Sequence, residues 1–330
     1  MPNLRLTLAC GDYDRTRALW DGRVSPEGIE LTYIPLTPEE LFFRMFEYNE
    51  FDISEMSFSN YLTEQSGTSP RFIAIPIFPS RYFRHSCVFI NKKSGITTPE
   101  DLKGKRVGTP AYSVTAGVFI RGFLQHDYGV APSDMEWYIG GQEEPGREDR
   151  VKVDLPQNVH IHPIPTNKTL NEMLASGDID ALISPRIPLC FWAKGTDVTR
   201  LWPNYKEVEI DYYRRTKIFP TMHTVVIRKE IYDVHPWVAN SLYKGFSQAK
   251  KLCQEVMNFS AALTNMLPWS IAEYESTVSL MGEDFWPYGV EANRVTLEAV
   301  TQYSYEQGLS QRKFSVEEIF APNTLKMTKV

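Results

Sequence analysis

The sequence predicts an α/β protein made of two doubly wound lobes that two crossover segments join. Short apolar stretches of strand character alternate with helical stretches over residues 4–78. The same alternation begins again at residue 106 and continues to residue 184. Two polar tracts, residues 79–86 and 219–224, separate the two halves and would carry the chain across. Alternation of this kind is typical of sheets covered by helices on both faces.

The chain length agrees with two lobes. At roughly 100–200 residues per domain, 330 residues form about two domains, each able to bury its own core. We expect lobe 1 to combine residues 1–85 and 221–330, and lobe 2 to hold residues 86–220. Because small-molecule sites often lie at domain interfaces, a ligand cleft is expected between the lobes.

Local signals support the elements of the first half. Residues 4–9 alternate apolar and polar side chains, which predicts a strand. Residues 37–40, Thr-Pro-Glu-Glu, supply an N-cap, a first-turn proline and acidic residues, which predicts a helix start. The nearly continuous apolar run 71–78 is typical of a buried parallel strand. The other predicted elements are strands at 29–34 and 51–54 and helices around 18–21 and 61–62.

The second half repeats the pattern. From residue 235 onward, apolar residues recur near the 3.6 period of a helix. Residues 140–150 are rich in glycine and charge without any period, which indicates a surface loop. The other predicted elements are strands at 87–90, 106–108, 135–139, 160–164, 179–184 and 225–228, and helices at 113–126 and 170–176.

Composition excludes several classes of protein. The formal net charge is −6, and no run of Lys or Arg is longer than a pair, which argues against a nucleic-acid partner. No segment approaches the ~18–20 apolar residues of a membrane helix. Four widely spaced cysteines favour free thiols in a reducing compartment. The residues before Cys10 are too few and too polar for a secretory signal, so we expect a cytoplasmic protein.

Two short motifs connect the chain to a known fold. Residues 101–108, Asp-Leu-Lys-Gly-Lys-Arg-Val-Gly, and residues 177–181, Gly-Asp-Ile-Asp-Ala, resemble the second lobe of type II periplasmic substrate-binding proteins. In that fold the first motif leads to a ligand-binding helix N-terminus, and the second enters a strand at the cleft. The resemblance therefore implies a type II periplasmic-binding-protein-like architecture.

Longer segments carry a narrower resemblance: residues 4–16, 81–86, 128–130 with Trp137, and 222–228. They resemble one enzyme family, the 4,5-dihydroxyphthalate decarboxylases. This resemblance implies a cytoplasmic enzyme of phthalate catabolism that releases CO₂ from 4,5-dihydroxyphthalate to give protocatechuate. The expected partner is a small aromatic dicarboxylate. No residue role is carried over from the family.

Other functions stay open at this point. A solute-binding or sensor protein for an aromatic carboxylate would share the fold without any catalysis. An enzyme of the same fold acting on another substrate is a second alternative. Assembly into a homo-oligomer is open as well, since decarboxylases of this size commonly assemble.

Three residues are candidates for the acid chemistry. Decarboxylation of an aromatic acid requires a proton on the ring carbon that bears the carboxylate, so the site needs a general acid. His85 and His223 lie in different crossings and are the candidates, because histidine titrates near neutral pH. Each could instead hold backbone carbonyls at a hinge. Glu55 could orient such a histidine, or it could cap the helix that follows.

Arginines and hydroxyls are candidates for binding the substrate carboxylates. An arginine fork matches a carboxylate, and donors at a helix N-terminus attract anions. Each of these residues has a structural alternative, such as a solvated arginine or a simple helix cap. The candidates for substrate binding are Asp12, Arg15, Arg81, Arg84, Thr109, Ser113 and Arg186.

Cofactor use is open. No required cofactor is the first hypothesis. The alternative is a divalent metal ion held by His85, His223 and Glu55.

Overall fold

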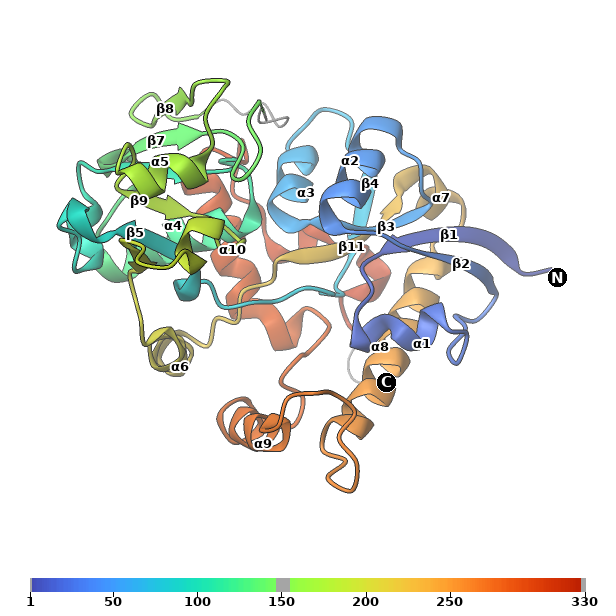
Figure 1. The fold of residues 1–330 in the computed structure, drawn as a ribbon. Coiled ribbons are helices and arrows are strands. Elements are labelled where there is room, and N and C mark those ends of the chain that lie inside the picture. The colour runs from blue at the N-terminus through green and yellow to red at the C-terminus, as the bar shows by residue number, and fades with distance from the viewer. Residues whose placement is uncertain (1, 147–154, 328–330) are drawn as a thin grey trace. The chain divides into compact units, whose positions relative to one another are not determined.

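The computed structural model describes residues 2–146 and 155–327. The chain divides into two compact units (Figure 1). Unit 1 comprises Met1–Arg81, His223–Leu297 and Phe314–Val330. Unit 2 comprises Tyr82–Met222 and Glu298–Lys313.

Unit 1 contains a five-stranded sheet in the order β2-β1-β3-β11-β4. Its strands are β1 (Leu4–Cys10), β2 (Ile29–Pro35), β3 (Ile53–Ser57), β4 (Phe72–Ile75) and β11 (His223–Arg228). Its helices are α1 (Arg17–Trp20), α2 (Pro38–Tyr48), α3 (Phe58–Gln65), α7 (Lys229–Val234), α8 (Trp237–Met257) and α9 (Ser270–Met281).

One strand of this sheet runs against its neighbours. β1 is parallel to both β2 and β3, whereas β11 is antiparallel to both β3 and β4. The apolar run 71–78 contains a buried strand as predicted, namely β4. The predicted parallel pairing of this strand is wrong, because its neighbour in the sheet is the antiparallel β11, which lies between β3 and β4. The insertion brings the start of β11 to the carboxyl end of β3, where His223 is the register partner of Ser57.

The apolar faces of the unit 1 sheet are buried. Leu8, Ile53 and Val226, from three adjacent strands, are fully buried. α8 adds an apolar face that includes Leu242 and Phe246. Burial of this kind stabilises each unit by roughly 25 cal/mol per Å² of apolar surface.

Unit 2 contains a six-stranded mixed sheet in the order β10-β5-β9-β6-β7-β8. Its strands are β5 (Val88–Asn91), β6 (Arg106–Thr109), β7 (Glu136–Ile139), β8 (His160–Pro163), β9 (Ala181–Ile183) and β10 (Val198–Arg200). Its helices are α4 (Thr115–Tyr128), α5 (Leu170–Ser176) and α6 (Tyr205–Thr216), with the larger part of α10 (Arg294–Glu306).

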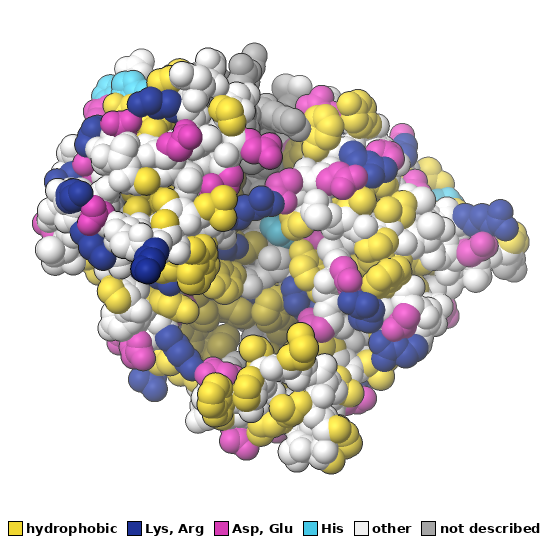
Figure 2. All heavy atoms as spheres, in the orientation of Figure 1, with side chains coloured by type: hydrophobic (Ala, Val, Ile, Leu, Met, Phe, Trp, Pro, Cys, Tyr) yellow, Lys and Arg dark blue, Asp and Glu magenta, His cyan; other side chains and the backbone are white. Residues whose placement is uncertain are grey.

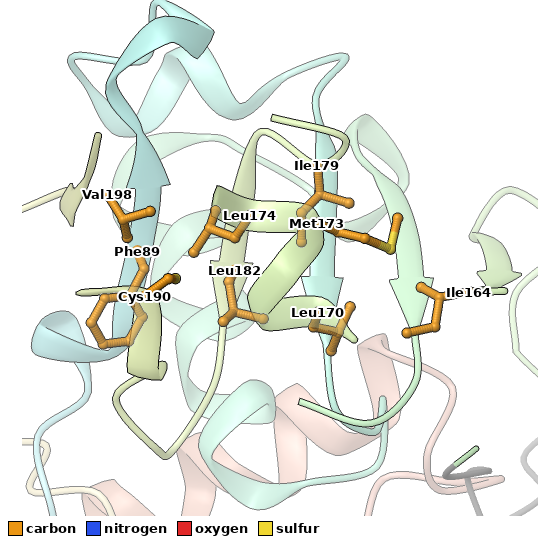
Figure 3. Packing of buried hydrophobic residues seen from close by; sticks show 9 residues of the cluster. All are labelled: Phe89, Ile164, Leu170, Met173, Leu174, Ile179, Leu182, Cys190 and Val198. Atoms are coloured by element: carbon orange, nitrogen blue, oxygen red, sulfur yellow. The ribbon is translucent and has the colours of Figure 1, made fainter. Parts of the chain in front are cut away.

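A compact apolar cluster joins α5 to the unit 2 sheet (Figure 3). Leu170 and Leu174 of α5 are fully buried beside Leu182 of β9. The helix starts at Thr169, whose side chain accepts a hydrogen bond from the Glu172 backbone in a capping box. The whole cluster consists of Phe89, Ile164, Leu170, Met173, Leu174, Ile179, Leu182, Cys190 and Val198.

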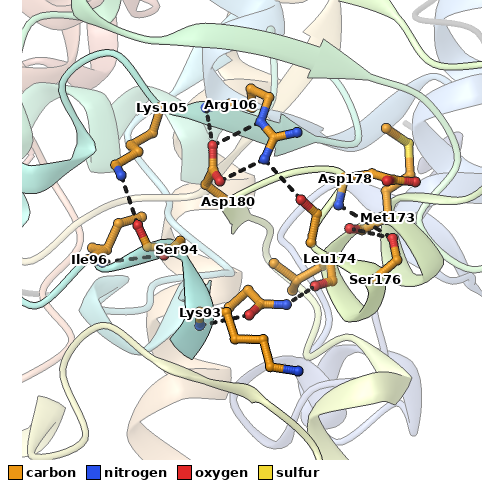
Figure 4. Close-up of polar contacts among 12 residues, drawn as sticks. Lys93, Ser94, Ile96, Lys105, Arg106, Met173, Leu174, Ser176, Asp178 and Asp180 are labelled. Carbon is orange, nitrogen blue, oxygen red and sulfur yellow. Dashed lines mark hydrogen bonds and ion pairs between the residues drawn. The ribbon is translucent and has the colours of Figure 1, made fainter.

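The two motifs singled out in the sequence contact each other in unit 2 (Figure 4). The Asp180 carboxylate accepts hydrogen bonds from the Arg106 backbone at 2.9 Å and from its guanidinium at 2.8 and 3.0 Å. Arg106 also donates to the Gly177 carbonyl at 2.9 Å. These contacts fix the start of β6 against the start of β9, so the motifs hold the sheet together.

The lobe boundaries expected from the sequence differ from the units in three segments. Residues 82–85 and 221–222 were expected in lobe 1, but they belong to unit 2. The same holds for residues 298–313. Gln307 explains this placement, because its side chain accepts from Arg121 Nε at 2.8 Å and donates to the Val118 carbonyl at 2.9 Å. The helices α8, α9 and α10 lie in the region from residue 235 onward where a helical period was expected, whereas α6 and β10 were not predicted. Residues 147–150 of the expected loop 140–150 lie outside the described residues.

The surface of unit 1 includes an uncharged apolar stretch around α9. Residues 258–272 contain no charged side chain, and every residue of α9 is at least partly exposed. Figure 2 shows hydrophobic side chains gathered over this part of the surface. The exposed large side chains of the stretch are Phe259, Leu263, Met266, Leu267 and Trp269.

No helix within residues 2–146 and 155–327 is both long enough and apolar enough to cross a membrane.

Candidate functional site

Glu55 occupies a buried position near the carboxyl end of β3. Its side chain is 0% exposed. β3 lies between β1 and β11 in the sheet, so Glu55 meets residues from the end of one strand and the start of the other. A charged side chain at such a position requires hydrogen-bond donors around it.

Four groups donate to the Glu55 carboxylate. Oε1 lies 2.5 Å from His223 Nδ1 and accepts from the Tyr13 hydroxyl at 2.8 Å. Oε2 accepts from the Gly11 backbone N–H at 2.8 Å and from the Cys10 thiol at 3.4 Å. The carboxylate is therefore saturated by protein groups. The alternative that Glu55 caps the following helix is wrong, because its oxygens face β1, the loop after β1 and β11.

The surroundings of Glu55 favour its ionised form. Burial raises the pKa of Glu55. The charge and hydrogen bond of His223 lower it, as do the hydrogen bonds from Gly11 and Tyr13, and together these groups outweigh the effect of burial. The net effect lowers the pKa of Glu55 below its usual value. Burial and the nearby Glu55 charge raise the pKa of Tyr13, so its hydroxyl stays a donor. The same two causes raise the pKa of the Cys10 thiol, which is thereby kept unreactive.

His223 is oriented by this carboxylate. It is the first residue of β11, and its side chain is 16% exposed. Because Nδ1 faces Glu55, Nε2 is the nitrogen left for a ligand. The ring of Phe42 packs edge-on against the imidazole with centroids 4.9 Å apart. The imidazole therefore has a fixed position and one available nitrogen.

Arg15 lies beside the same cluster. Its guanidinium is held between the rings of Tyr13 and Trp286, 4.2 and 4.5 Å from their centroids. Nε donates to the Pro79 carbonyl at 2.5 Å, and Nη1 pairs with Asp14 at 3.0 Å. The side chain is 18% exposed. A guanidinium held in this way presents its remaining N–H groups as a fixed fork for an anion.

Two other unit 1 candidates have protein partners. Asp12 forms an ion pair with Arg17, and both side chains are nearly half exposed. Arg81 is buried, donates to the Pro287 carbonyl at 3.0 Å and bonds the Asn293 side chain. These contacts give Arg81 a role in holding the chain around residue 290.

His85 lies in unit 2, whereas His223 lies in unit 1. Its ring stacks on Phe123 with centroids 4.1 Å apart and meets Trp202 and Tyr212 edge-on. The ring is 1% exposed, and Nδ1 is 4.0 Å from Glu209. Burial, followed by repulsion from Arg215, lowers the pKa of His85 to about 3. A neutral imidazole enclosed in this way is poorly suited to deliver a proton near pH 7.

The remaining unit 2 candidates lie near the carboxyl ends of β6 and β9 or in the first crossing. Arg84 Nε contacts Met222 Sδ at 3.1 Å, and its guanidinium lies over the Tyr82 ring. Thr109 ends β6 and donates to the Ala111 carbonyl at 3.3 Å.

Two further candidates flank those strand ends. Ser113 precedes Val114, which occupies the N-cap position of α4, so the helix cap that was the structural alternative for Ser113 is not at this residue. Arg186 is exposed after β9, where its backbone N–H donates to Ser184 Oγ at 3.1 Å. The substrate roles of these four residues of unit 2 stay predictions.

The structure thus joins Glu55, His223 and Arg15 through one side chain that sequence reasoning missed, Tyr13. In the sequence, residues 11–16 indicate only a polar loop after a strand. A tyrosine two residues after a glycine at a strand end was the available signal. Among the described residues, no three or more His, Cys, Asp or Glu side chains are grouped so that they could hold a metal ion.

Comparison with known proteins identifies relatives along the chain. A 4,5-dihydroxyphthalate decarboxylase from Comamonas testosteroni is 39% identical over 331 positions, which cover 100% of this chain and 100% of the relative. A 4,5-dihydroxyphthalate decarboxylase from Pseudomonas putida is 43% identical over 215 residues, 65% of this chain and 83% of the relative. The chain belongs to the 4,5-dihydroxyphthalate decarboxylase family. The resemblance noted in the sequence is confirmed.

Structural comparison establishes the fold of this decarboxylase family member. The periplasmic aliphatic sulphonate binding protein from Escherichia coli superposes with a TM-score of 0.52 at 13% identity, covering 99% of this chain and 100% of that chain. Residues 82–144 also match the family model described as NMT1/THI5 like. The predicted periplasmic-binding-protein-like α/β fold is therefore confirmed.

Proposed function

We propose that this chain catalyses the non-oxidative decarboxylation of 4,5-dihydroxyphthalate to protocatechuate and CO₂ in phthalate catabolism. The observation that carries the proposal is the full-length similarity to a decarboxylase of that name. The enzyme class is then a carboxy-lyase acting on an aromatic acid. The Glu55–His223 pair supports the proposal because it supplies an oriented proton donor.

The chemistry requires one proton and no redox partner. The proton of His223 Nε2 adds to the ring carbon that bears the leaving carboxylate, and the hydroxyl para to that carbon donates electron density. The carbon–carbon bond then breaks, its electron pair restores the aromatic ring, and CO₂ departs. His223 is reprotonated from solvent before the next cycle. A positioned general acid of this kind contributes typically 10²–10⁴-fold.

The neighbouring groups supply orientation and charge. Glu55 fixes the imidazole tautomer and stabilises the imidazolium, because its buried carboxylate faces Nδ1 at 2.5 Å. Arg15 binds a substrate carboxylate with the N–H groups that Pro79 and Asp14 do not occupy. We expect no cofactor, and turnover with and without added metal tests this expectation.

The deciding experiment measures turnover directly. Purified, chelator-treated protein is mixed with 4,5-dihydroxyphthalate, and CO₂ and protocatechuate are followed with and without added Mg²⁺ or Mn²⁺. Equal amounts of both products without metal are expected. His223→Gln should lose turnover by about 10²–10⁴-fold while it keeps most of the substrate affinity. Turnover only with added metal would assign His223 and Glu55 to a metal site instead.

The alternative function is a solute-binding or sensor protein for an aromatic carboxylate. The periplasmic-binding-protein-like fold favours this alternative, since that fold is shared with a protein named as a binding protein. Calorimetric binding of 4,5-dihydroxyphthalate without any CO₂ would establish it. Two further properties stay predictions. Cell fractionation would test the cytoplasmic location, and sedimentation velocity would test the assembly into a homo-oligomer.

A further inference from the structure

Tyr13 contacts both parts of the proposed site. Its hydroxyl donates to Glu55 Oε1 at 2.8 Å, on the same oxygen that faces His223 Nδ1. Its ring lies beneath the Arg15 guanidinium at 4.2 Å. One side chain therefore touches the carboxylate that orients the proton donor and the cation proposed to bind the substrate.

The backbone around Tyr13 is shaped for this placement. A Cβ atom on Gly11 would lie 2.4 Å from Tyr13 Cζ and 2.7 Å from its hydroxyl oxygen. Only glycine allows the ring to lie this close to the chain, while the Gly11 N–H binds Glu55 Oε2 at 2.8 Å. Gly11 is itself held from the other side, because its carbonyl accepts from the Tyr33 hydroxyl at 2.7 Å.

We propose that Tyr13 is a positioning residue with two separable effects, one on the Glu55–His223 pair through its hydroxyl and one on Arg15 through its ring. The proposal rests on the proposed function, in which His223 donates the proton and Arg15 binds a carboxylate. The Tyr13 hydroxyl shares Glu55 Oε1 with His223, so without this hydroxyl the carboxylate charge would act more strongly on His223. The ring and Trp286 together keep the guanidinium in one plane.

Each effect has its own substitution. Tyr13→Phe removes the hydroxyl and keeps the ring under Arg15, so kcat and its pH profile should change while KM stays within about twofold. The Glu55 charge then acts more strongly on the His223 proton, which moves the basic limb of the profile to higher pH by roughly half to one unit. Tyr13→Leu removes the ring as well as the hydroxyl, so KM should rise several-fold in this variant and not in Tyr13→Phe. Trp286→Leu removes the opposite ring and should raise KM while the pH profile stays unchanged.

The first experiment does not depend on turnover. The protein is labelled with ¹⁵N-histidine, the His223 resonance is assigned by its loss in His223→Gln, and its titration is followed by NMR. Tyr13→Phe should move the titration midpoint of His223 to higher pH by roughly half to one unit. Tyr33→Phe is the matched control, because its hydroxyl bonds Gly11 and Thr16 and not Glu55, and it should leave the midpoint in place.

The second experiment uses steady-state kinetics with 4,5-dihydroxyphthalate. If folded Tyr13→Phe shows the wild-type His223 titration and the wild-type pH profile, the proposal for Tyr13 is overturned. This result is independent of the proposed function, which wild-type turnover and its loss in His223→Gln would still support. Absence of CO₂ release by the wild type would overturn the proposed function and leave the titration test to decide on Tyr13. If Tyr13→Phe does not fold, Gly11→Ala, which displaces the ring, should move the His223 midpoint in the same direction.

Discussion

His223 Nδ1 lies 2.5 Å from Glu55 Oε1, although the two residues are 168 positions apart in the chain. The antiparallel insertion of β11 beside β3 creates this contact, since Val225 of β11 is the register partner of Glu55. A histidine held by a buried carboxylate has a fixed tautomer and one nitrogen open to a ligand. The pairing with Glu55 therefore makes His223, of the two histidine candidates, the better placed proton donor.

Glu55→Gln tests the carboxylate. The amide keeps the shape of the side chain but loses the charge, and its NH₂ group faces donors such as the Gly11 N–H. We expect kcat to fall by about 10–10³-fold, with a smaller effect on KM, because the imidazolium loses its counter-charge. Steady-state kinetics between pH 5 and 9 measure this. Wild-type kcat in a folded Glu55→Gln protein would remove Glu55 from the mechanism.

His85→Phe separates the two histidines. Phenylalanine keeps the stack on Phe123, so we expect turnover within about threefold of wild type. A loss of 10²-fold or more in this variant would make His85 the acid, as the sequence also allowed. Turnover is measured beside His223→Gln under the same conditions.

His85 also predicts a pH dependence of stability. Its pKa is about 3 in the folded chain, so from pH 6.5 down to about 3 the unfolded chain takes up a proton that the folded chain does not. Stability of the wild type should therefore fall as the pH falls through this range. His85→Phe should show a smaller loss in urea unfolding, and equal slopes for the two proteins would contradict the burial of a neutral imidazole.

Glu209 predicts the opposite slope. Burial raises its pKa to about 7, despite hydrogen bonds from the Ser86 and His85 backbone, so the folded chain holds a proton from about pH 4.5 to 7. Because the unfolded chain has already released this proton, stability contributed by Glu209 is lost as the pH rises through that range. Glu209→Gln should flatten the slope above pH 4.5 in urea unfolding. An unchanged slope in Glu209→Gln would show that the carboxyl ionises normally.

Arg15→Lys tests carboxylate binding. Lysine keeps the charge but loses the planar fork between Tyr13 and Trp286, so KM for the diacid should rise about tenfold with kcat nearly unchanged. Arg17→Lys is the control, since Arg17 pairs with Asp12 and stacks on Trp20. If KM instead rises only in Arg84→Ala, the carboxylate is bound in the first crossing.

Leu182→Ala tests the apolar cluster of unit 2. Leu182 is fully buried between α5 and the sheet, so the substitution should cost about 2–5 kcal/mol of unfolding free energy. Chemical denaturation measures the change. Ile187→Ala, at an exposed position after β9, should cost far less, and equal losses would place Leu182 outside a packed core.

The sequence alone determined the fold class and the family. Strands and helices with local signals appear where they were expected, for instance α5 at Leu170–Ser176, because alternation, capping and apolar period are local properties. It also selected His223, Glu55 and Arg15 by residue type and by their positions at predicted crossings and strand ends.

The tertiary structure decided which of these residues lie together. Only the antiparallel pairing of β11 brings His223 to Glu55, and only the close approach of the Tyr13 ring to Gly11 joins both to Arg15. The burial that lowers the pKa of His85 likewise comes from aromatic residues 38 to 127 positions away in the chain, at Phe123 and Tyr212. Pairing register and burial are non-local, so no window of sequence contains them.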